Sequence, residues 1–189
     1  MTRRPETMAE ADAVDLLVRQ HEEIRRLCHQ VETNTGGRQA EAFERLRRLL
    51  AVHETAEEQI IHPLIRRSIP FGDQIVDARL AEEKKGKRML RDLERMGTAA
   101  PSFTPMFARF RTAVLQHAER EELEEFPALR GRGQAELRGL AAAIKAAEAV
   151  APTHPHPGVE SMTKNLLFGA FASITDRVRD LFRRTPGRG

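Results

Sequence analysis

Six histidine and glutamate side chains occupy sequence positions where buried apolar residues are expected. They interrupt series of hydrophobic residues that recur at alternating steps of three and four, the spacing of the inward face of a bundle helix. Imidazole and carboxylate groups together suit iron, manganese or zinc. Burying an ionised carboxylate without a partner is costly, so bound cations are the expected compensation. The six residues are His21, His53, Glu57, Glu83, His117 and Glu121.

Four of the six form two His-x-x-x-Glu pairs, His53 with Glu57 and His117 with Glu121. Residues four apart lie on the same face of a helix. One such pair on a charge-rich helix is more often a surface ion pair than a metal site. Two pairs, each in phase with the apolar residues of its own helix, favour a metal site, and His21 on a further helix strengthens that interpretation.

Four long helices, separated by breaks that contain glycine or proline, are predicted to position these residues. Asp73 is expected to cap the third helix. Short connections between long helices favour neighbours that run in opposite directions. The predicted fold class is all-α: an antiparallel up-down-up-down four-helix bundle with additional C-terminal helices. The four helices are expected at about residues 8–33, 39–67, 73–96 and 101–130.

Further segments follow the bundle, which is assigned to residues 8–130. A short accessory helix is expected at 134–150, a proline-rich linker at 151–160 and an amphipathic helix at 161–184. The last helix has an apolar face and a basic face. It is a candidate for packing on the bundle or in a homodimer, or for contact with a partner protein or a membrane surface.

The composition narrows the class of protein. Alanine, leucine, glutamate and arginine dominate the 189 residues, as is typical of helices. The net charge is only +3 and both signs are interspersed, so no nucleic-acid partner is expected. The chain has one cysteine and no apolar run near the ~18 residues of a membrane span, and a cytoplasmic location is expected. Tyrosine and tryptophan are absent, which excludes a tyrosyl-radical mechanism.

The two His-x-x-x-Glu pairs also resemble those of a known family. The segments HETAEE (53–58) and HAEREE (117–122) each lead into a proline-containing apolar segment near the predicted helix end. Over about residues 12–130 the chain resembles the hemerythrin-like HHE cation-binding family. This resemblance implies two non-haem irons, bridged by carboxylates and by an oxo or hydroxo group, with manganese or zinc as less favoured metals. It also implies that His21 is the first-helix ligand and that Glu57 and Glu121 are bridges.

The third helix departs from the family pattern, because the family usually offers a histidine there and this helix has none. Glu83 stands at the equivalent position and is the expected ligand. The alternatives are ligation by Glu82 or an additional water on that iron. Gly86, one turn further along the same face, is expected to leave space for a small ligand.

Other potential ligands are expected to have lesser roles. Cys28 is expected to be buried and structural. His62 is expected to be exposed. Three further residues are expected to be exposed or to support the ligands from behind: His29, Glu54 and Glu58. His154 and His156 are expected to lie in the linker.

A ligand set rich in carboxylates stabilises ferric iron and should lower the reduction potential. The expected function is therefore catalase-like disproportionation of hydrogen peroxide, and the chain is expected to be an enzyme. The alternative is a protein that binds or senses dioxygen, nitric oxide or iron without turnover. The residues expected to form a dry wall around the ligand pocket are Phe43, Phe103, Phe107 and Phe110.

Overall fold

The structure is a computed structural model that describes residues 11–150. Helices and short connections make up the whole of that part, and it contains no strand. The helices are α1 (Ala13–Thr33), α2 (Gly36–Ala56), η1 (Glu57–Ile61), α3 (His62–Ser68), α4 (Gly72–Met96), α5 (Phe103–Glu124), α6 (Phe126–Arg130) and α7 (Gln134–Val150). The expected helix at 161–184 lies outside the described residues.

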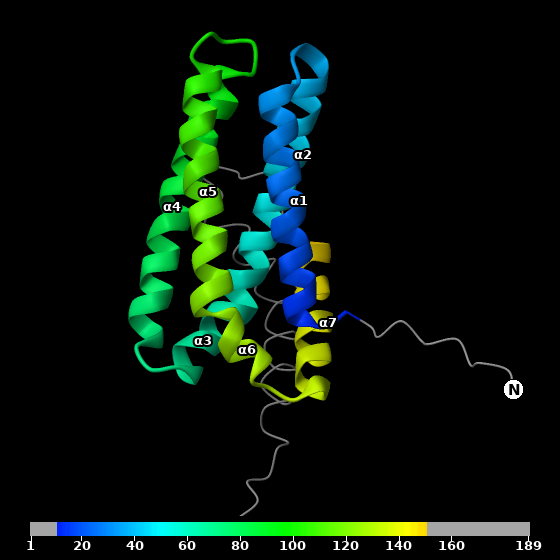
Figure 1. Cartoon of the computed structure of the whole chain (residues 1–189), viewed down its shortest axis with the longest axis vertical. Coiled ribbons are helices and arrows are strands. Elements are labelled where there is room, and N and C mark those ends of the chain that lie inside the picture. The colour runs from blue at the N-terminus through cyan, green and yellow to red at the C-terminus, as the bar shows by residue number, and fades with distance from the viewer. Residues whose placement is uncertain (1–10, 151–189) are drawn as a thin grey trace, which may run out of the picture.

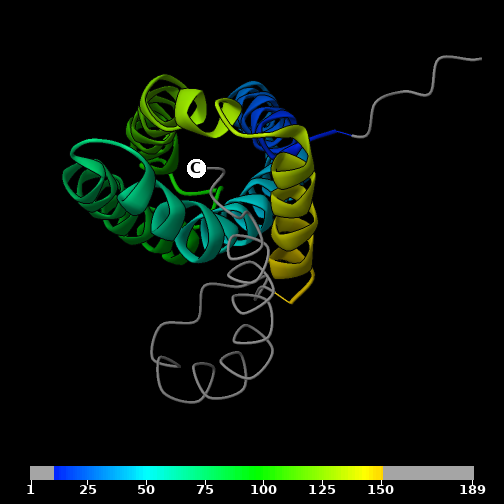
Figure 2. The ribbon, with the colours of Figure 1, turned by 90° about the horizontal axis from the view of Figure 1, so that it is seen from below.

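Four long helices run antiparallel to their neighbours and enclose a common interior. The helices α1 and α2 form one hairpin and α4 and α5 form another, as Figure 1 shows. The helix α7 lies along the outside of α1 and α2, which is clear in the view from below in Figure 2. The predicted all-α, up-down-up-down bundle is confirmed.

A π-helical turn interrupts the second long helix. The helices α2, η1 and α3 follow one another without a break, and the η1 segment Glu57–Ile61 has π geometry. The backbone N–H of His62 donates to the carbonyl oxygen of Glu57, five residues earlier. A π turn adds one residue to a helical turn and so shifts the face on which all later residues lie. The sequence predicted one regular helix here, and that part of the prediction was wrong.

Two helix starts differ from the predictions. The helix α2 begins at Gly36, whose φ of 59° suits glycine, rather than at residue 39. Asp73 does not cap α4, because Phe71 occupies that position with φ 60° and Asp73 instead accepts a hydrogen bond from Arg66. Gly72 allows this turn to close, since a Cβ atom there would lie 2.5 Å from the carbonyl oxygen of Ile65.

The buried apolar residues form two clusters, one toward each end of the bundle. The upper cluster contains Cys28 and a set of four mutually contacting rings, the phenylalanine cluster: Phe43, Phe103, Phe107 and Phe110. The lower cluster lies where α1, α3, α6 and α7 meet. No helix within residues 11–150 is both long enough and apolar enough to cross a membrane.

Candidate metal centre

The first two histidines enter the interior from α1 and α2 and are buried there. His21 is 0% exposed and His53 is 2% exposed. The Nδ1 atom of His21 lies 2.8 Å from Oε1 of Glu122, and that of His53 lies 2.7 Å from Oε1 of Gln20. Gln20 donates its amide N–H to Glu148 on α7, so its oxygen is the atom that faces His53. Each ring therefore donates from Nδ1 and directs Nε2 toward the interior.

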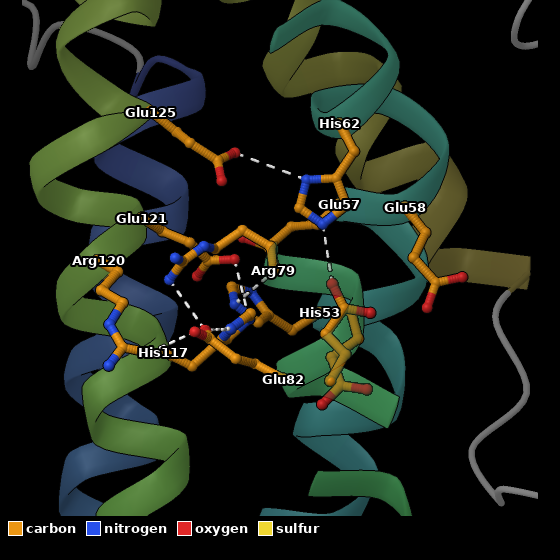
Figure 3. Close-up of polar contacts among 12 residues, drawn as sticks. His53, Glu57, Glu58, His62, Arg79, Glu82, His117, Arg120, Glu121 and Glu125 are labelled. Carbon is orange, nitrogen blue, oxygen red and sulfur yellow. Dashed lines mark hydrogen bonds and ion pairs between the residues drawn. The ribbon is translucent and has the colours of Figure 1, made fainter. Parts of the chain in front are cut away.

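The third histidine, His117 on α5, is held in the same way. Its Nδ1 atom lies 3.1 Å from Oε2 of Glu82 on α4. Glu82 is itself fixed by Arg79 and Arg120. Figure 3 shows this set beside Glu121. A carboxylate that orients a histidine from behind is the usual support of a metal-bound imidazole. Glu82 therefore orients His117 from behind, which gives no support to the alternative in which Glu82 replaces the third-helix histidine as a ligand.

Glu57 and Glu121 lie at the centre of the site, on the same helices as His53 and His117. Each is 1% exposed. Oε2 of Glu57 lies 3.2 Å from Nε2 of His53, and the two oxygens of Glu121 lie 3.3 Å from Nε2 of His21 and 3.0 Å from Nε2 of His117. Ligand atoms of His21, His53, Glu57 and Glu121 all lie within 4.8 Å of one another.

These close contacts do not have hydrogen-bond geometry. Neither oxygen of Glu121 accepts a hydrogen bond from the described residues, and the same holds for Oε2 of Glu57. Nε2 of His117 also has no hydrogen-bond partner there. Atoms bound to one metal at about 2.0–2.2 Å lie about 3 Å from one another. The donor atoms therefore fit a bound cation better than they fit a hydrogen-bond network.

The contact between His21 and His53 supports the same conclusion. Their Nε2 atoms face each other at 3.1 Å. Because each ring donates from Nδ1, two neutral imidazoles would place lone pair against lone pair at this contact. A cation bound by both nitrogens removes that repulsion.

In the metal-free chain the centre holds its charges unevenly. Burial, followed by repulsion from His21, lowers the pKa of His53 to about 3, so this ring is neutral. Burial and the neighbouring Glu121 raise the pKa of Glu57 well above its usual value. Burial acts on Glu121 in the same sense, but its close contacts with the rings of His117 and His21 outweigh burial and hold the pKa of Glu121 well below the usual range.

The protonation of His117 follows from the same contacts. Burial opposes its charged form, but Glu121 and Glu82 outweigh that effect and raise the pKa of His117 to about 9. A metal ion bound at Nε2 would displace this proton, since metal ligation requires the deprotonated ring.

Glu83 is buried at 3% exposure on α4, as expected for a residue that takes the place of the third-helix histidine. Its Oε1 atom lies 2.8 Å from Nε2 of His62, and its Oε2 atom lies 3.3 Å from Nζ of Lys87. Hydrogen bonds from His62 and the charge of Lys87 outweigh the effect of burial and lower the pKa of Glu83. Glu83 is thus an ionised carboxylate at the edge of the centre.

Two further residues complete the buried set: His62, which sequence reasoning missed, and Glu125, which the helical spacing offered together with Glu124 as the inward residue after Glu121. His62 was expected to be exposed and is instead 2% exposed. Glu125 is 1% exposed, which decides the inward position on α5 in its favour over Glu124, whose side chain is 44% exposed. Nδ1 of His62 lies 3.5 Å from Oε2 of Glu125, a contact that Figure 3 shows. Together with His117, whose side chain is 12% exposed, the seven buried residues make up what we call the ionisable cluster: His21, His53, Glu57, His62, Glu83, His117, Glu121 and Glu125.

A pocket opens beside this cluster, between α1, α2, α4 and α5. Both the histidines and apolar side chains line it, and Gly86 forms part of its wall. A Cβ atom at Gly86 would meet no atom within 4 Å, so this position does leave open space. The apolar lining comes from Ile24, Leu50, Ala113, Val114 and Ala118. The expectation that the phenylalanines form the wall was wrong, because they pack on one another further up the bundle.

The other potential ligands have separate places. His29 is exposed, and Cys28 is buried in the upper apolar cluster, both as expected. Glu58 is exposed, but Glu54 lines the pocket with only 14% of its side chain exposed. Burial raises the pKa of Glu54 to about 7. His154 and His156 lie outside the described residues.

Comparison with known proteins agrees with this site. Residues 12–129 match the family described as Hemerythrin HHE cation binding domain. The structure resembles the crystal structure of a hemerythrin HHE cation binding domain-containing protein from Mycobacterium kansasii, with a TM-score of 0.64 and 19% identity over 87% of this chain and 99% of that one. No match was found among curated proteins. The family match spans most of the chain and includes both His-x-x-x-Glu pairs, and this chain therefore belongs to the hemerythrin HHE cation-binding domain family.

Proposed function

We propose that the ionisable cluster binds two iron ions and that the chain decomposes hydrogen peroxide. The observation that carries this proposal is the convergence of buried histidine nitrogens and carboxylate oxygens, with no hydrogen-bond donors for several of them, beside a small pocket. Iron is preferred because of the family resemblance, and because imidazole and carboxylate ligands suit it.

The residues divide between the two ions according to the helices that carry them. His21 and His53 face each other and would hold one ion together with Glu57 and Glu121. His117 would hold the second ion, with Glu83 as its ligand from α4. Glu121 contacts both His21 and His117, and Glu57 lies beside Glu121 and His53, so we assign these two carboxylates as the bridges.

Hydrogen peroxide disproportionation needs a site that can accept and return two electrons. One peroxide gives up two electrons and two protons to become dioxygen, and a second takes them up to become two waters. The iron pair, when bound, stores the two electrons between these half-reactions. The carboxylates of Glu57, Glu83 and Glu121 favour ferric iron, so the centre is expected to rest oxidised rather than to carry dioxygen reversibly.

The pocket determines which molecules reach the centre. Apolar side chains such as Ile24, Leu50 and Val114 line it together with Gly86, and a molecule as small as peroxide fits such a lining. The hydrogen bonds of His21, His53 and His117 to residues behind them keep their Nε2 atoms directed inward without rearrangement during turnover.

Oxygen evolution from hydrogen peroxide tests the proposal. The iron-loaded chain should release one dioxygen for every two peroxides consumed, with no added reductant, and the metal-free chain should release none. Glu121→Gln should lose at least about 100-fold of the rate, since ligand loss exceeds the 10–100-fold typical of supporting residues. A matched control is Glu44→Gln, which alters an exposed ion pair on α2 and should leave the rate unchanged.

Binding of peroxide, azide or nitric oxide by the iron-loaded chain without any release of dioxygen would contradict the catalytic proposal. That result would favour the alternative of a binding or sensing protein. A cytoplasmic location also remains a prediction.

A further inference from the structure

The chain lacks the imidazole that the third helix would be expected to contribute. No histidine lies between residues 63 and 116, so α4 offers only carboxylates and cations to the centre. We propose that His62, together with Glu125, supplies the missing ligands and completes the second metal position around Glu83. This inference rests on the proposed two-metal centre but not on the reaction that the centre catalyses.

The π turn is the feature that brings His62 into the site. In a regular α-helix, residues five apart point about 140° away from one another. The η1 segment closes its turn with a hydrogen bond from the His62 N–H to the Glu57 carbonyl, so residues five apart are nearly aligned. His62 is consequently 2% exposed and faces the same interior as Glu57. Such single π turns are frequent at functional sites.

Glu125 reaches the same place from the opposite side of the bundle. The helix α5 ends at Glu124, and the N–H of Glu125 still donates to the carbonyl of Glu121, 2.9 Å away. Glu125 is therefore one turn beyond Glu121 on the same face. Its carboxylate is 1% exposed, and neither of its oxygens has a hydrogen-bond partner of good geometry among the described residues.

His62 lies between the two carboxylates and contacts both. Its Nε2 atom is 2.8 Å from Glu83, and its Nδ1 atom is 3.5 Å from Glu125. In Figure 3 the ring of His62 points into the bundle, toward Glu57, and not toward solvent. His62 thus meets one buried carboxylate through each of its ring nitrogens, and imidazole and carboxylate are donor types that suit a divalent or trivalent metal.

Burial opposes the charged form of His62, but Glu125 and Glu83 outweigh it and raise the pKa of His62 to about 9, so in the metal-free chain the ring is a cation between these two carboxylates. Lys87 is partly exposed, and its ion pairs among the described residues are with Glu83, Glu54 and Glu58. Buried carboxylates without compensation are strongly disfavoured. A metal ion bound by His62 would take the place of the ring's extra proton and supply the positive charge in its stead.

A purely supporting role for His62 predicts a different outcome from ligation. If His62 only held Glu83 by hydrogen bonding, a glutamine could replace it, because the amide is also a donor of similar size. A glutamine is a poor metal ligand, so ligation predicts loss of one ion. His62→Gln therefore separates the two roles, and His29→Gln on the exposed face of α1 is the matched control.

The experiment measures metal per chain in the full-length protein. Wild type, His62→Gln, Glu125→Gln and His29→Gln are loaded with ferrous iron without oxygen, oxidised, desalted and analysed for iron by mass spectrometry. The wild type and the His29 control should hold two irons, and the other two variants should hold about one. Electron paramagnetic resonance should then show an isolated ferric ion in place of a spin-coupled, silent pair.

The outcomes separate this inference from the proposed function. Two irons in both His62→Gln and Glu125→Gln would overturn the inference while leaving the two-metal centre in place. A wild-type chain that binds only one iron would overturn the two-metal centre and this inference with it. Circular dichroism monitors folding, and if His62→Gln does not fold, the iron content of Glu125→Gln decides the question.

Discussion

The upper and lower halves of the bundle interior bury different kinds of side chain, aromatic in the upper half and ionisable in the lower half. In the upper half, the phenylalanine cluster packs ring against ring at centroid distances of 5.2–6.2 Å, and nothing there requires a partner. In the lower half, next to the apolar cluster where α1, α3, α6 and α7 meet, the ionisable cluster brings together four histidines and four glutamates. Seven of these eight are buried, and several have no hydrogen-bond partner among the described residues. The upper half is stabilised mainly by packing, whereas the lower half combines its apolar packing with charges that a bound cation would neutralise.

This difference separates stability from chemistry along the same four helices. The apolar half fixes the spacing of the helices, and that spacing holds the ligand atoms about 3 Å apart without a loop in the site. Changes in the upper half should therefore lower stability and preserve metal binding. Changes to the ionisable cluster should remove metal binding and lower stability only by as much as the bound metal contributes.

The largest effect on stability is expected from Phe107→Ala. Phe107 is 1% exposed and contacts three other rings, so its truncation should lower the free energy of unfolding by about 3–5 kcal/mol. Urea titration measures this loss. Leu123→Ala, at a side chain 69% exposed, is the control and should change stability little. Loss of bound metal in folded Phe107→Ala would contradict the separation of the two halves.

Removal of the metal should have the next largest effect. Ions that bind only the folded chain stabilise it by about 2.7 kcal/mol at a concentration of 100 Kd. Thermal unfolding of the loaded and the chelated protein measures the difference. The same difference should appear in Phe107→Ala, because the two sites are separate and their effects should add. Equal melting temperatures with and without metal would show that the ionisable cluster does not need a cation.

A smaller effect is expected from Glu82→Gln. This change weakens the acceptor that orients His117 but leaves every proposed ligand in place. Metal affinity should fall by about 10–100-fold, as for other residues that support a ligand from behind. Competition with a chelator of known affinity measures the change. An unchanged affinity would mean that the bundle positions His117 without Glu82.

The smallest response is expected at Cys28, in the apolar half. Burial raises the pKa of this thiol to about 12, so at pH 8 it is protonated and shielded. An aromatic disulfide reagent should react with it only as fast as the bundle opens, and at the ordinary rate in denaturant. Rapid modification of the folded chain would show that the upper half is less well packed than its apolar contacts indicate.

The sequence predicted those parts of the site that follow regular helical spacing. His53 with Glu57 and His117 with Glu121 lie four apart on unbroken turns, so their common face could be read directly. His62 could not be placed in this way, because the π turn before it shifts the helical phase. The extra apolar pair Ile60 and Ile61, both buried, is the one sequence signal of that shift.

The position of Glu83 was predicted, whereas its surroundings were not. Its alignment with the third-helix position depends only on the regular spacing of α4. The contact of Glu83 with His62 joins residues 21 positions apart on different helices, and no periodicity within one helix reveals such a pair. The apolar half shows the same limit, since the phenylalanines were correctly placed in the interior but wrongly placed at the pocket.

A crystal structure of the iron-loaded chain, with anomalous diffraction collected at the iron edge, tests the central claim most directly. The account predicts two iron peaks inside the ionisable cluster, one within bonding distance of His21 and His53 and both beside Glu57 and Glu121. No iron peak there, with Glu57 and Glu121 turned toward solvent or hydrogen-bonded only to protein and water, would contradict it.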